Sequence, residues 1–257
     1  MSNDRVKTGV KGLDEMLGGG LMPQTANLVE GPPGTGKSTL GMQFIYNGIR
    51  NHNEPGLVVT FEEFPQQYYR DAEGFGWDFR QLEREGKLRV IMTSPEVSRA
   101  DLESVGGTIE TLAREMGARR ILIDSISHFD QLAEDPVELR AVVYGFVNSL
   151  KREGLTSILT RESPVLLGGD EQQESAIGFV VDSYILLRYV EIESAIRKAL
   201  LVLKLRGSDH AKDIRQFEIT GQGIEIMSKF EGREGIMSGS PRRMAEAFIE
   251  AFGKPLR

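Results

Sequence analysis

Cysteine is absent from the 257-residue sequence, as are long apolar runs and any excess of positive charge. Without cysteine, disulfide bonds, cysteine-ligated zinc and thiol chemistry are excluded, which suits a protein of the reducing cytoplasm. The apolar runs, such as Ala199–Leu203, are far shorter than the roughly 18–20 residues that cross a bilayer, and residues 1–17 lack the apolar stretch of a secretory signal. We therefore expect a cytoplasmic protein that does not insert into a membrane.

The charge balance gives no general attraction to nucleic acid. The chain has 38 acidic residues and 31 Lys and Arg, for a formal net charge of −7, so only a local basic patch could bind a phosphate backbone. Hydrophobic residues at 40% and charged residues at 27% are ordinary for a globular protein. The length is sufficient for one large domain with a buried core.

Strand-like and helix-like patterns alternate along the first two thirds of the chain, which predicts a mostly parallel, twisted α/β sheet with helices on both faces. The expected strands are Gln24–Glu30, Gly56–Phe61, Leu88–Met92, Arg120–Ile123 and Thr156–Thr160, and the expected helices are Lys37–Arg50, Pro65–Glu73, Asp101–Met116 and Pro136–Arg152. Several of these strands are continuous apolar runs, as is typical of strands buried on both faces.

The pattern changes after Gly178. Consecutive strands are expected at Phe179–Val190, Ala195–Leu205, Gln216–Thr220 and Ile224–Met227, and we interpret them as antiparallel strands that extend the same sheet. Residues 233–257 form a tail in which Arg242–Phe252 has an amphipathic helical pattern. With no linker or repeat, residues 1–257 are predicted to form a single domain.

The residues Gly31–Ser38, with the sequence GPPGTGKS, match the phosphate-binding pattern GxxxxGK[ST] in full. The loop lies between a predicted strand and a predicted helix, which is the context that the pattern requires. Backbone N–H groups and the helix N-terminus would surround the phosphates. Residues 34–39 (Gly34, Thr35, Gly36, Lys37, Ser38 and Thr39) are therefore expected to bind ATP, with Lys37 at the β- and γ-phosphates and Ser38 on Mg²⁺.

Acidic residues follow two of the predicted strands. Asp124 ends the apolar strand that begins at Arg120, and this position beside the nucleotide crevice suits a ligand of Mg²⁺; capping of a following helix is the alternative. Glu62 and Glu63 follow the strand Gly56–Phe61, where a carboxylate could polarise the attacking water. Two solvated loop acids are the alternative for this pair.

Two cations, Lys204 and Arg206, lie near the end of a predicted strand. In a strand they share one face about 6–7 Å apart, so they could bind a polyphosphate and stabilise charge on the γ-oxygens. Protection of an edge strand by charge is the alternative.

The order and spacing of these motifs resemble the KaiC group of RecA-like P-loop ATPases, a family named for a cyanobacterial clock protein. The resemblance rests on residues 8–14 (TGVKGLD), 17–20 (LGGG), 31–38, 61–63 (FEE), 75–78 (FGWD), 204–210 (KLRGSDH), 217–220 (FEIT) and 238–242 (SGSPR). It implies a ring, usually a homohexamer, with ATP at each subunit interface. It also implies that Glu62 is the water-activating base with Glu63 in support. Lys204 and Arg206 would act on the γ-phosphate of the neighbouring subunit, with Leu205, Ser208 and His210 near its ribose and base.

The sequence departs from the family pattern in two ways. The clock protein has two such domains in tandem, whereas this chain has one, most similar to the second repeat. The two positions that match the autophosphorylation sites of that repeat are Gly178 and Phe179, which carry no hydroxyl. Autokinase activity at these positions is therefore not expected.

Three functions remain open at this stage. The chain could be a slow ATPase that acts as a nucleotide-driven switch for a protein partner, a DNA-handling RecA paralogue, or an assembly scaffold that binds ATP without appreciable hydrolysis. The loops that would contact DNA, residues 131–138 and 162–177, are rich in acids and lack interleaved aromatic and basic residues, so nucleic acid is not expected as a partner. The pair Glu62 and Glu63 argues against the scaffold.

Overall fold

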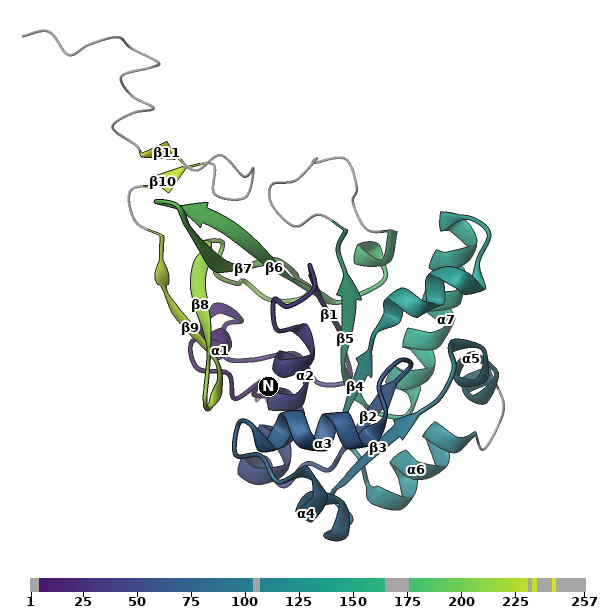
Figure 1. Ribbon diagram of the computed structural model, residues 1–257. Helices are drawn as coiled ribbons and strands as arrows, with labels where there is room; N and C mark the ends of the chain where they lie inside the picture. The colour runs from purple at the N-terminus through teal and green to yellow at the C-terminus, as the bar shows by residue number, and fades with distance from the viewer. Residues whose placement is uncertain (1–4, 104–106, 165–175, 231–232, 235–241, 244–257) are drawn as a thin grey trace, which may run out of the picture.

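The computed structural model describes residues 5–103, 107–164, 176–230, 233–234 and 242–243. Within this part of the chain, nine strands form one sheet in the order β3-β2-β4-β5-β1-β6-β7-β8-β9 (Figure 1). The strands are β1 Ala26–Gly31, β2 Gly56–Thr60, β3 Leu88–Met92, β4 Arg120–Asp124, β5 Thr156–Glu162, β6 Ser183–Ile192, β7 Ala195–Leu205, β8 Arg215–Thr220 and β9 Gly223–Lys229. The predicted mostly parallel sheet with C-terminal antiparallel strands is therefore confirmed.

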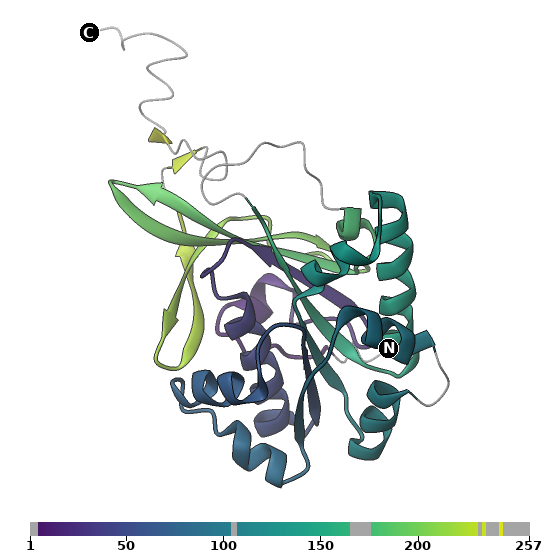
Figure 2. The same cartoon turned by 45° about the vertical axis from the view of Figure 1, so that its right-hand side comes forward.

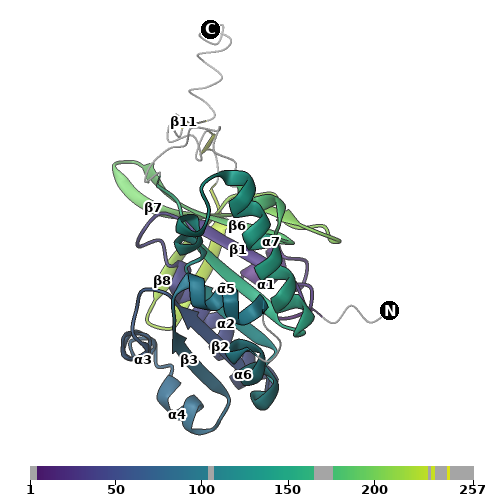
Figure 3. The ribbon, with the colours of Figure 1, turned by 90° about the vertical axis from the view of Figure 1, so that its right-hand side faces the viewer.

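Helices cover both faces of the parallel part of the sheet. The helices α1 Leu13–Met16, α2 Lys37–His52, α3 Pro65–Glu73 and α4 Phe79–Arg84 pack into one apolar cluster. On the other face lie α5 Pro95–Glu103, α6 Thr108–Met116, α7 Pro136–Arg152 and the short 3₁₀ segments η1 Ile126–Leu132 and η2 Ala176–Phe179. Figure 3 shows α5, α6 and α7 on the side turned to the viewer.

The two apolar clusters form because the central strands carry buried side chains on both faces of the sheet. Every residue of β1 and β2 is buried, because each strand has neighbours on both sides and helices on both faces. The hairpin of β6 and β7 extends away from these helical layers (Figure 2), and its outer half carries a smaller cluster around Val190 and Ala199.

The structure differs from the sequence prediction in two helical regions. Residues 101–116 do not form one helix, because α5 ends at Glu103 and α6 begins at Thr108 after Gly107. The Asp101 carboxylate accepts a hydrogen bond from the backbone N–H of Ile109 at 2.8 Å, so it caps the second helix. In the tail, Arg242–Arg243 forms β11 and pairs with β10 Arg233–Glu234, rather than beginning a helix; residues 244–252 lie outside the described part.

The first strand after Gly178 begins later than predicted. β6 begins at Ser183 rather than at Phe179, since residues 176–179 form η2. It pairs parallel with β1 on one side and antiparallel with β7 on the other. The predicted antiparallel extension of the same sheet is confirmed by the pairs β6–β7, β7–β8 and β8–β9.

Candidate nucleotide site

The phosphate-binding loop connects the carboxyl end of β1 to the first turn of α2. Gly34 has φ 75° and Gly36 has φ 102°, a region that residues with a Cβ rarely adopt. A Cβ on Gly34 would also lie 2.8 Å from the hydroxyl of Tyr189, and one on Gly36 would lie 2.8 Å from Cδ1 of Ile219. The glycines of the motif are therefore required by both backbone conformation and space.

Lys37 is held against its own loop. Its ammonium donates a hydrogen bond to the carbonyl oxygen of Pro32 at 3.1 Å, and the hydroxyl of Thr35 donates to the same oxygen at 2.8 Å. The Lys37 side chain is buried, which lowers its pKa, while the carboxylates of Glu162 and Asp124 oppose that shift. A phosphate anion in the loop would supply the counter-charge that favours the protonated ammonium.

Asp124 ends β4 directly beside Thr60, the last residue of β2. The two oxygens of its carboxylate accept hydrogen bonds from the hydroxyls of Tyr68 and Thr160, one each. Because a carboxylate oxygen has a second lone pair, each remains able to accept a further bond from a metal-bound water. The expected alternative, a capping role for Asp124, is not what the geometry shows, since Ser125 caps η1 through its hydroxyl.

The two glutamates after β2 have different environments. The strand ends at Thr60, whose hydroxyl accepts the backbone N–H of Glu63 at 3.1 Å, so the pair lies in a bend. Glu62 has a side chain that is 75% exposed and lies 3.5 Å from Nε2 of His128. Glu63 is half-buried, and burial, reinforced by the negative charges of Asp124 and neighbouring acids, raises the pKa of its carboxyl group.

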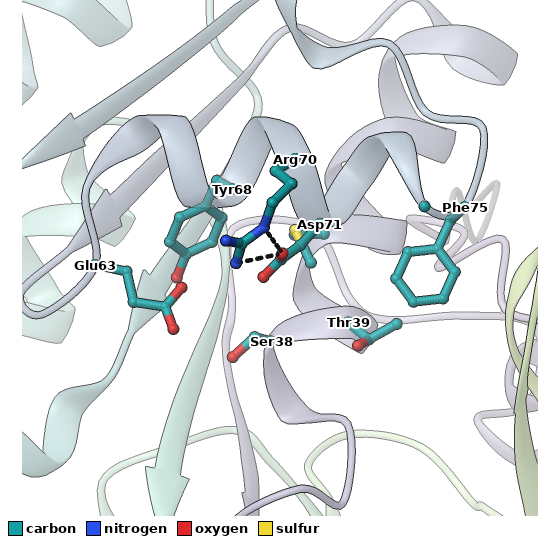
Figure 4. A pocket seen from close by; sticks show the side chains of 9 residues that line it. Ser38, Thr39, Glu63, Tyr68, Arg70, Asp71 and Phe75 are labelled. Carbon is teal, nitrogen blue, oxygen red and sulfur yellow. Dashed lines mark hydrogen bonds and ion pairs between the residues drawn. The ribbon is translucent and has the colours of Figure 1, made fainter.

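A cavity of about 480 Å³ opens beside the loop. Figure 4 shows Ser38 and Thr39 of α2 on one side and residues of α3 on the other, with Glu63 and Phe75 at opposite ends. Its wall also includes Arg70 and Asp71, whose side chains form an ion pair at 2.9 Å. The cavity combines an aromatic ring, a carboxylate and the hydroxyl that follows the phosphate-binding lysine.

The predicted cation pair lies near the amino end of β1 and β6, whereas the phosphate loop follows the carboxyl end of β1. Leu205, the last residue of β7, pairs with Ser183, and Ser183 pairs with Asn27, four residues before Gly31. At about 3.3 Å per residue, the two ends are roughly 13 Å apart along the strands alone. The structure therefore does not bring Lys204 or Arg206 to the phosphate loop of the same chain.

Both cations contact the segment that precedes β6. The Lys204 ammonium donates to the carbonyl oxygens of Gly178 at 2.9 Å and Val181 at 2.8 Å, and burial lowers its pKa. Arg206 donates from Nη2 to the carbonyl oxygen of Phe179 at 2.9 Å. Both therefore contact the same short segment, although Arg206 lies in the turn beyond the strand in which the prediction placed it.

The remaining residues of this segment form a turn against the N-terminal region. The Ser208 hydroxyl accepts a hydrogen bond from Arg5 at 2.5 Å, and Leu205 is buried in the core. Nδ1 of His210 is buried and has no hydrogen-bond partner among the described residues. Like the cations, Leu205, Ser208 and His210 belong to a region separate from the loop.

Sequence reasoning missed residues around the proposed site, among them Tyr68 and Thr160, which hold Asp124, Phe75 in the cavity wall, and His128 beside Glu62. Tyr189 and Lys198 contact the loop itself, since the Tyr189 hydroxyl donates to the carbonyl oxygen of Pro33 at 3.3 Å and the Lys198 ammonium to that of Gly34 at 3.1 Å. Phe75 was noted only as part of a motif. The signal that could have identified Tyr68 is its place in the amphipathic helix α3, on the face turned toward the ends of β2 and β4.

Comparisons with known proteins show the family of this chain. The family model described as "ATPase: KaiC" matches residues 6–231. The circadian clock protein KaiC3 of Synechocystis is 36% identical over 249 residues, which cover 97% of this chain and 48% of that protein. The circadian clock oscillator protein KaiC of Thermostichus vulcanus is 38% identical over 244 residues, covering 95% of this chain and 46% of that protein. The chain thus spans about half the length of these curated relatives.

Within the described residues, no helix is both long and apolar enough to cross a membrane. The phosphate loop, the strand-end acids and the segment around Lys204 all lie within the matched residues. The chain belongs to the KaiC family of ATPases.

Proposed function

We propose that this chain binds Mg²⁺ and ATP and hydrolyses ATP slowly, as a nucleotide-driven switch in a homohexameric ring with sites shared between subunits. The observation that carries the proposal is the separation within one chain. A complete phosphate loop follows the carboxyl end of β1, and the cation pair Lys204 and Arg206 lies near the amino end of the same strand. A second subunit can supply Lys204 and Arg206 to each loop, which its own chain reaches with Lys198, whose ammonium donates to the carbonyl oxygen of Gly34 at 3.1 Å.

Ser38 and Asp124 would hold Mg²⁺ together with phosphate oxygens. The donor set fits this ion, because Mg²⁺ in nucleotide sites is bound by one or two protein oxygens and completed by waters and phosphates. Tyr68 and Thr160 orient the Asp124 carboxylate without exhausting its lone pairs. The metal would neutralise charge on the β- and γ-phosphates during transfer.

Hydrolysis requires a water in line with the γ-phosphate and a group that accepts its proton. Glu62 has an exposed carboxylate at the end of β2, next to the end of β4, and Glu63 lines the cavity behind it. Lys37 would move from the Pro32 carbonyl to the phosphates. Arg206 would have to leave the Phe179 carbonyl to act on a neighbour, which supports slow turnover.

The cavity beside the loop would receive the rest of the nucleotide. Its volume of about 480 Å³ and the ring of Phe75 suit a base that stacks on an aromatic face. Phe75 itself stacks on Trp77 with ring centroids 4.8 Å apart, so the platform is supported from behind. Residues from the neighbouring subunit, among them Ser208 and His210, would close the site.

Turnover is proposed to end in hydrolysis rather than in phosphorylation of residues 178 and 179. Gly178 has no side chain and Phe179 has no hydroxyl. Phe179 lies in η2, where its carbonyl oxygen binds Arg206.

Sizing by light scattering with and without Mg·ATP tests the ring, and release of phosphate tests hydrolysis. A hexamer that turns over ATP supports the proposal. A monomer at every nucleotide concentration would contradict the shared site. A hexamer without turnover would leave the assembly scaffold, and a severalfold rise in turnover with single-stranded DNA would favour the RecA paralogue.

A further inference from the structure

A groove with apolar walls and two arginines lies on the α7 face of the molecule. It has a volume of about 400 Å³ and is lined by α7, η2 and the turn after β7. Three large apolar side chains are exposed there, Val137 at 78%, Tyr144 at 58% and Phe179 at 50%. The guanidinium carbon of Arg140 lies 5.4 Å from the ring centroid of Phe179. This groove, formed by Val137, Arg140, Tyr144, Phe179 and Arg206, is here named the α7 groove.

Another exposed aromatic side chain, Phe64, lies beside the proposed nucleotide site. Phe64, 63% exposed, directly follows Glu62 and Glu63 and precedes α3. Its backbone is held at the helix start, because its N–H donates to the side chain of Gln67 at 2.8 Å and its carbonyl accepts the N–H of Gln67 at 2.9 Å. The buried residues of α3 are Tyr68, Tyr69 and Ala72. Phe64 itself thus has most of its surface exposed to solvent.

These two features are complementary in shape and charge. The α7 groove offers apolar walls with two guanidinium groups, and the segment Glu62–Phe64 offers a phenyl ring with two carboxylates. Aromatic pairs contribute beyond their buried area, and a guanidinium also attracts the face of an aromatic ring. The carboxylates would meet the arginines at the rim of the contact, where charges set orientation and specificity.

Among the described residues that line the α7 groove, none belongs to the segment Glu62–Phe64 of the same chain. A second copy can bring them together. In the proposed ring, Arg206 approaches the γ-phosphate of the next subunit, and Glu62 and Phe64 lie at that same phosphate. Because Arg206 lines the α7 groove, the groove then faces the neighbour's segment Glu62–Phe64.

We infer that Phe64 of one protomer seats in the α7 groove of its partner, with Glu62 and Glu63 beside Arg140 and Arg206. This inference rests on the proposed function, since it requires the shared-site ring. It assigns a role to Phe179, which occupies a position where the family resemblance implies a phosphorylated hydroxyl. Here the position carries an aromatic wall of the subunit contact. Ring formation and ATP hydrolysis would then depend on neighbouring residues, since Phe64 lies two residues after the proposed base Glu62.

The absence of cysteine permits a direct test. The double variant Phe64→Cys with Tyr144→Cys would be treated with a short bis-maleimide in the presence of Mg²⁺ and a non-hydrolysable ATP analogue. If Phe64 seats in the α7 groove of the partner, the crosslinks join different subunits and produce a ladder of covalent oligomers on a denaturing gel, whereas a crosslink within one chain keeps the mass of a single subunit. Each single variant, treated alike, should give no ladder.

A matched control pairs Phe64→Cys with Met227→Cys, an exposed side chain on β9. This pair should give no ladder, although both thiols are accessible. Light scattering on the same samples tests ring assembly separately from the docking of Phe64. Absence of any assembly would contradict the proposed function. A ring in which positions 64 and 144 do not crosslink, or crosslink no more than positions 64 and 227, would overturn the docking inference and leave the ring standing.

A truncation gives a second measurement. Phe64→Ala removes an exposed ring, so folding of the protomer should be unaffected, and the thermal unfolding of dilute protomer provides the check. We expect the protein concentration at half-assembly to rise about tenfold or more, as for a central aromatic residue of an interface. Phe64→Tyr should retain assembly. An unchanged midpoint for Phe64→Ala would also count against the docking inference.

Discussion

The two ends of the parallel strands differ in the groups that they bring together within one chain. At the carboxyl ends, the phosphate loop, Asp124 and the pair of glutamates meet around a cavity. At the end where β7 finishes, Lys204 and Arg206 bind backbone carbonyls of residues 178–181, and Arg206 also pairs with the Asp182 carboxylate at 3.8 Å. The first region is a nearly complete nucleotide site. The second contains two cations that lie away from the phosphate loop of their own chain, and the proposed ring accounts for this difference.

Removing Arg206 is the sharpest way to test the comparison. For Arg206→Ala we expect turnover to fall by about 10³-fold, as for an arginine that stabilises transferred phosphate, while ATP binding by equilibrium dialysis persists. Arg197→Ala, on the same strand but at its exposed far end, is the control. In mixed rings, Arg206→Ala subunits should regain turnover from Lys37→Ala subunits that retain Arg206. No recovery in mixed rings would contradict a role across the interface.

The glutamates test the first region. We expect Glu62→Gln to lower turnover by about 10²-fold, because the neutral amide cannot accept a proton from water. Glu63→Gln should have a smaller effect, about tenfold, since a supporting carboxylate acts through its neighbour. Phosphate release under saturating ATP measures both. Equal turnover of the double variant and wild type would remove the hydrolysis assignment.

The first region was largely predictable from sequence, and the second was not. GPPGTGKS between a strand and a helix, and acids at two strand ends, suffice to locate the loop, Asp124 and the glutamates. Register then explains why they meet, since Thr60 and Asp124 end adjacent parallel strands. Lys204 and Arg206 were singled out as a pair. Their distance from the loop depends on the pairing of β6 with both β1 and β7, which no local pattern encodes.

The missed residues have a common physical cause. Tyr68 and Phe75 reach the site because of how α3 is rotated and placed over the strand ends, and tertiary packing decides that rotation. Likewise, the break between α5 and α6 depends on Asp101 capping residues eight positions away. Periodicity predicts that such helices exist and does not predict which side chains they bring to a distant strand.

A smaller effect is expected from Phe75, which lines the cavity beside the phosphate loop. Phe75→Ala should raise the KM for ATP about tenfold with little change in kcat, because loss of a stacking face removes roughly 1–3 kcal/mol of base binding. Phe75→Trp should restore the wild-type KM. Steady-state kinetics over a range of ATP concentrations measures both constants. A lower kcat at unchanged KM would show that Phe75 does not contact the base in the ground state.

The smallest expected effect concerns Glu30, the buried residue that precedes the phosphate loop on β1. The residue is 7% exposed, and Oε2 has no hydrogen-bond partner among the described residues. Burial raises the pKa of this carboxyl above its ordinary value of 4.5, while a hydrogen bond with Tyr184 and the charge of Arg161 partly oppose the shift. The folded protein therefore binds more protons than the unfolded chain as pH rises above about 4.5.

The free energy of unfolding should accordingly fall as pH rises from that value through the raised pKa of Glu30, where the buried group becomes charged. Glu30→Gln cannot ionise, so we expect a smaller loss of stability with pH than in wild type. Tyr184→Phe removes a hydrogen bond that favours the charged form, so we expect a larger loss. Urea denaturation at a series of pH values measures all three slopes. Identical slopes would mean that the pKa of Glu30 is the same in the folded and unfolded protein, and the phosphate-loop end of the sheet would then be less enclosed than its packing indicates.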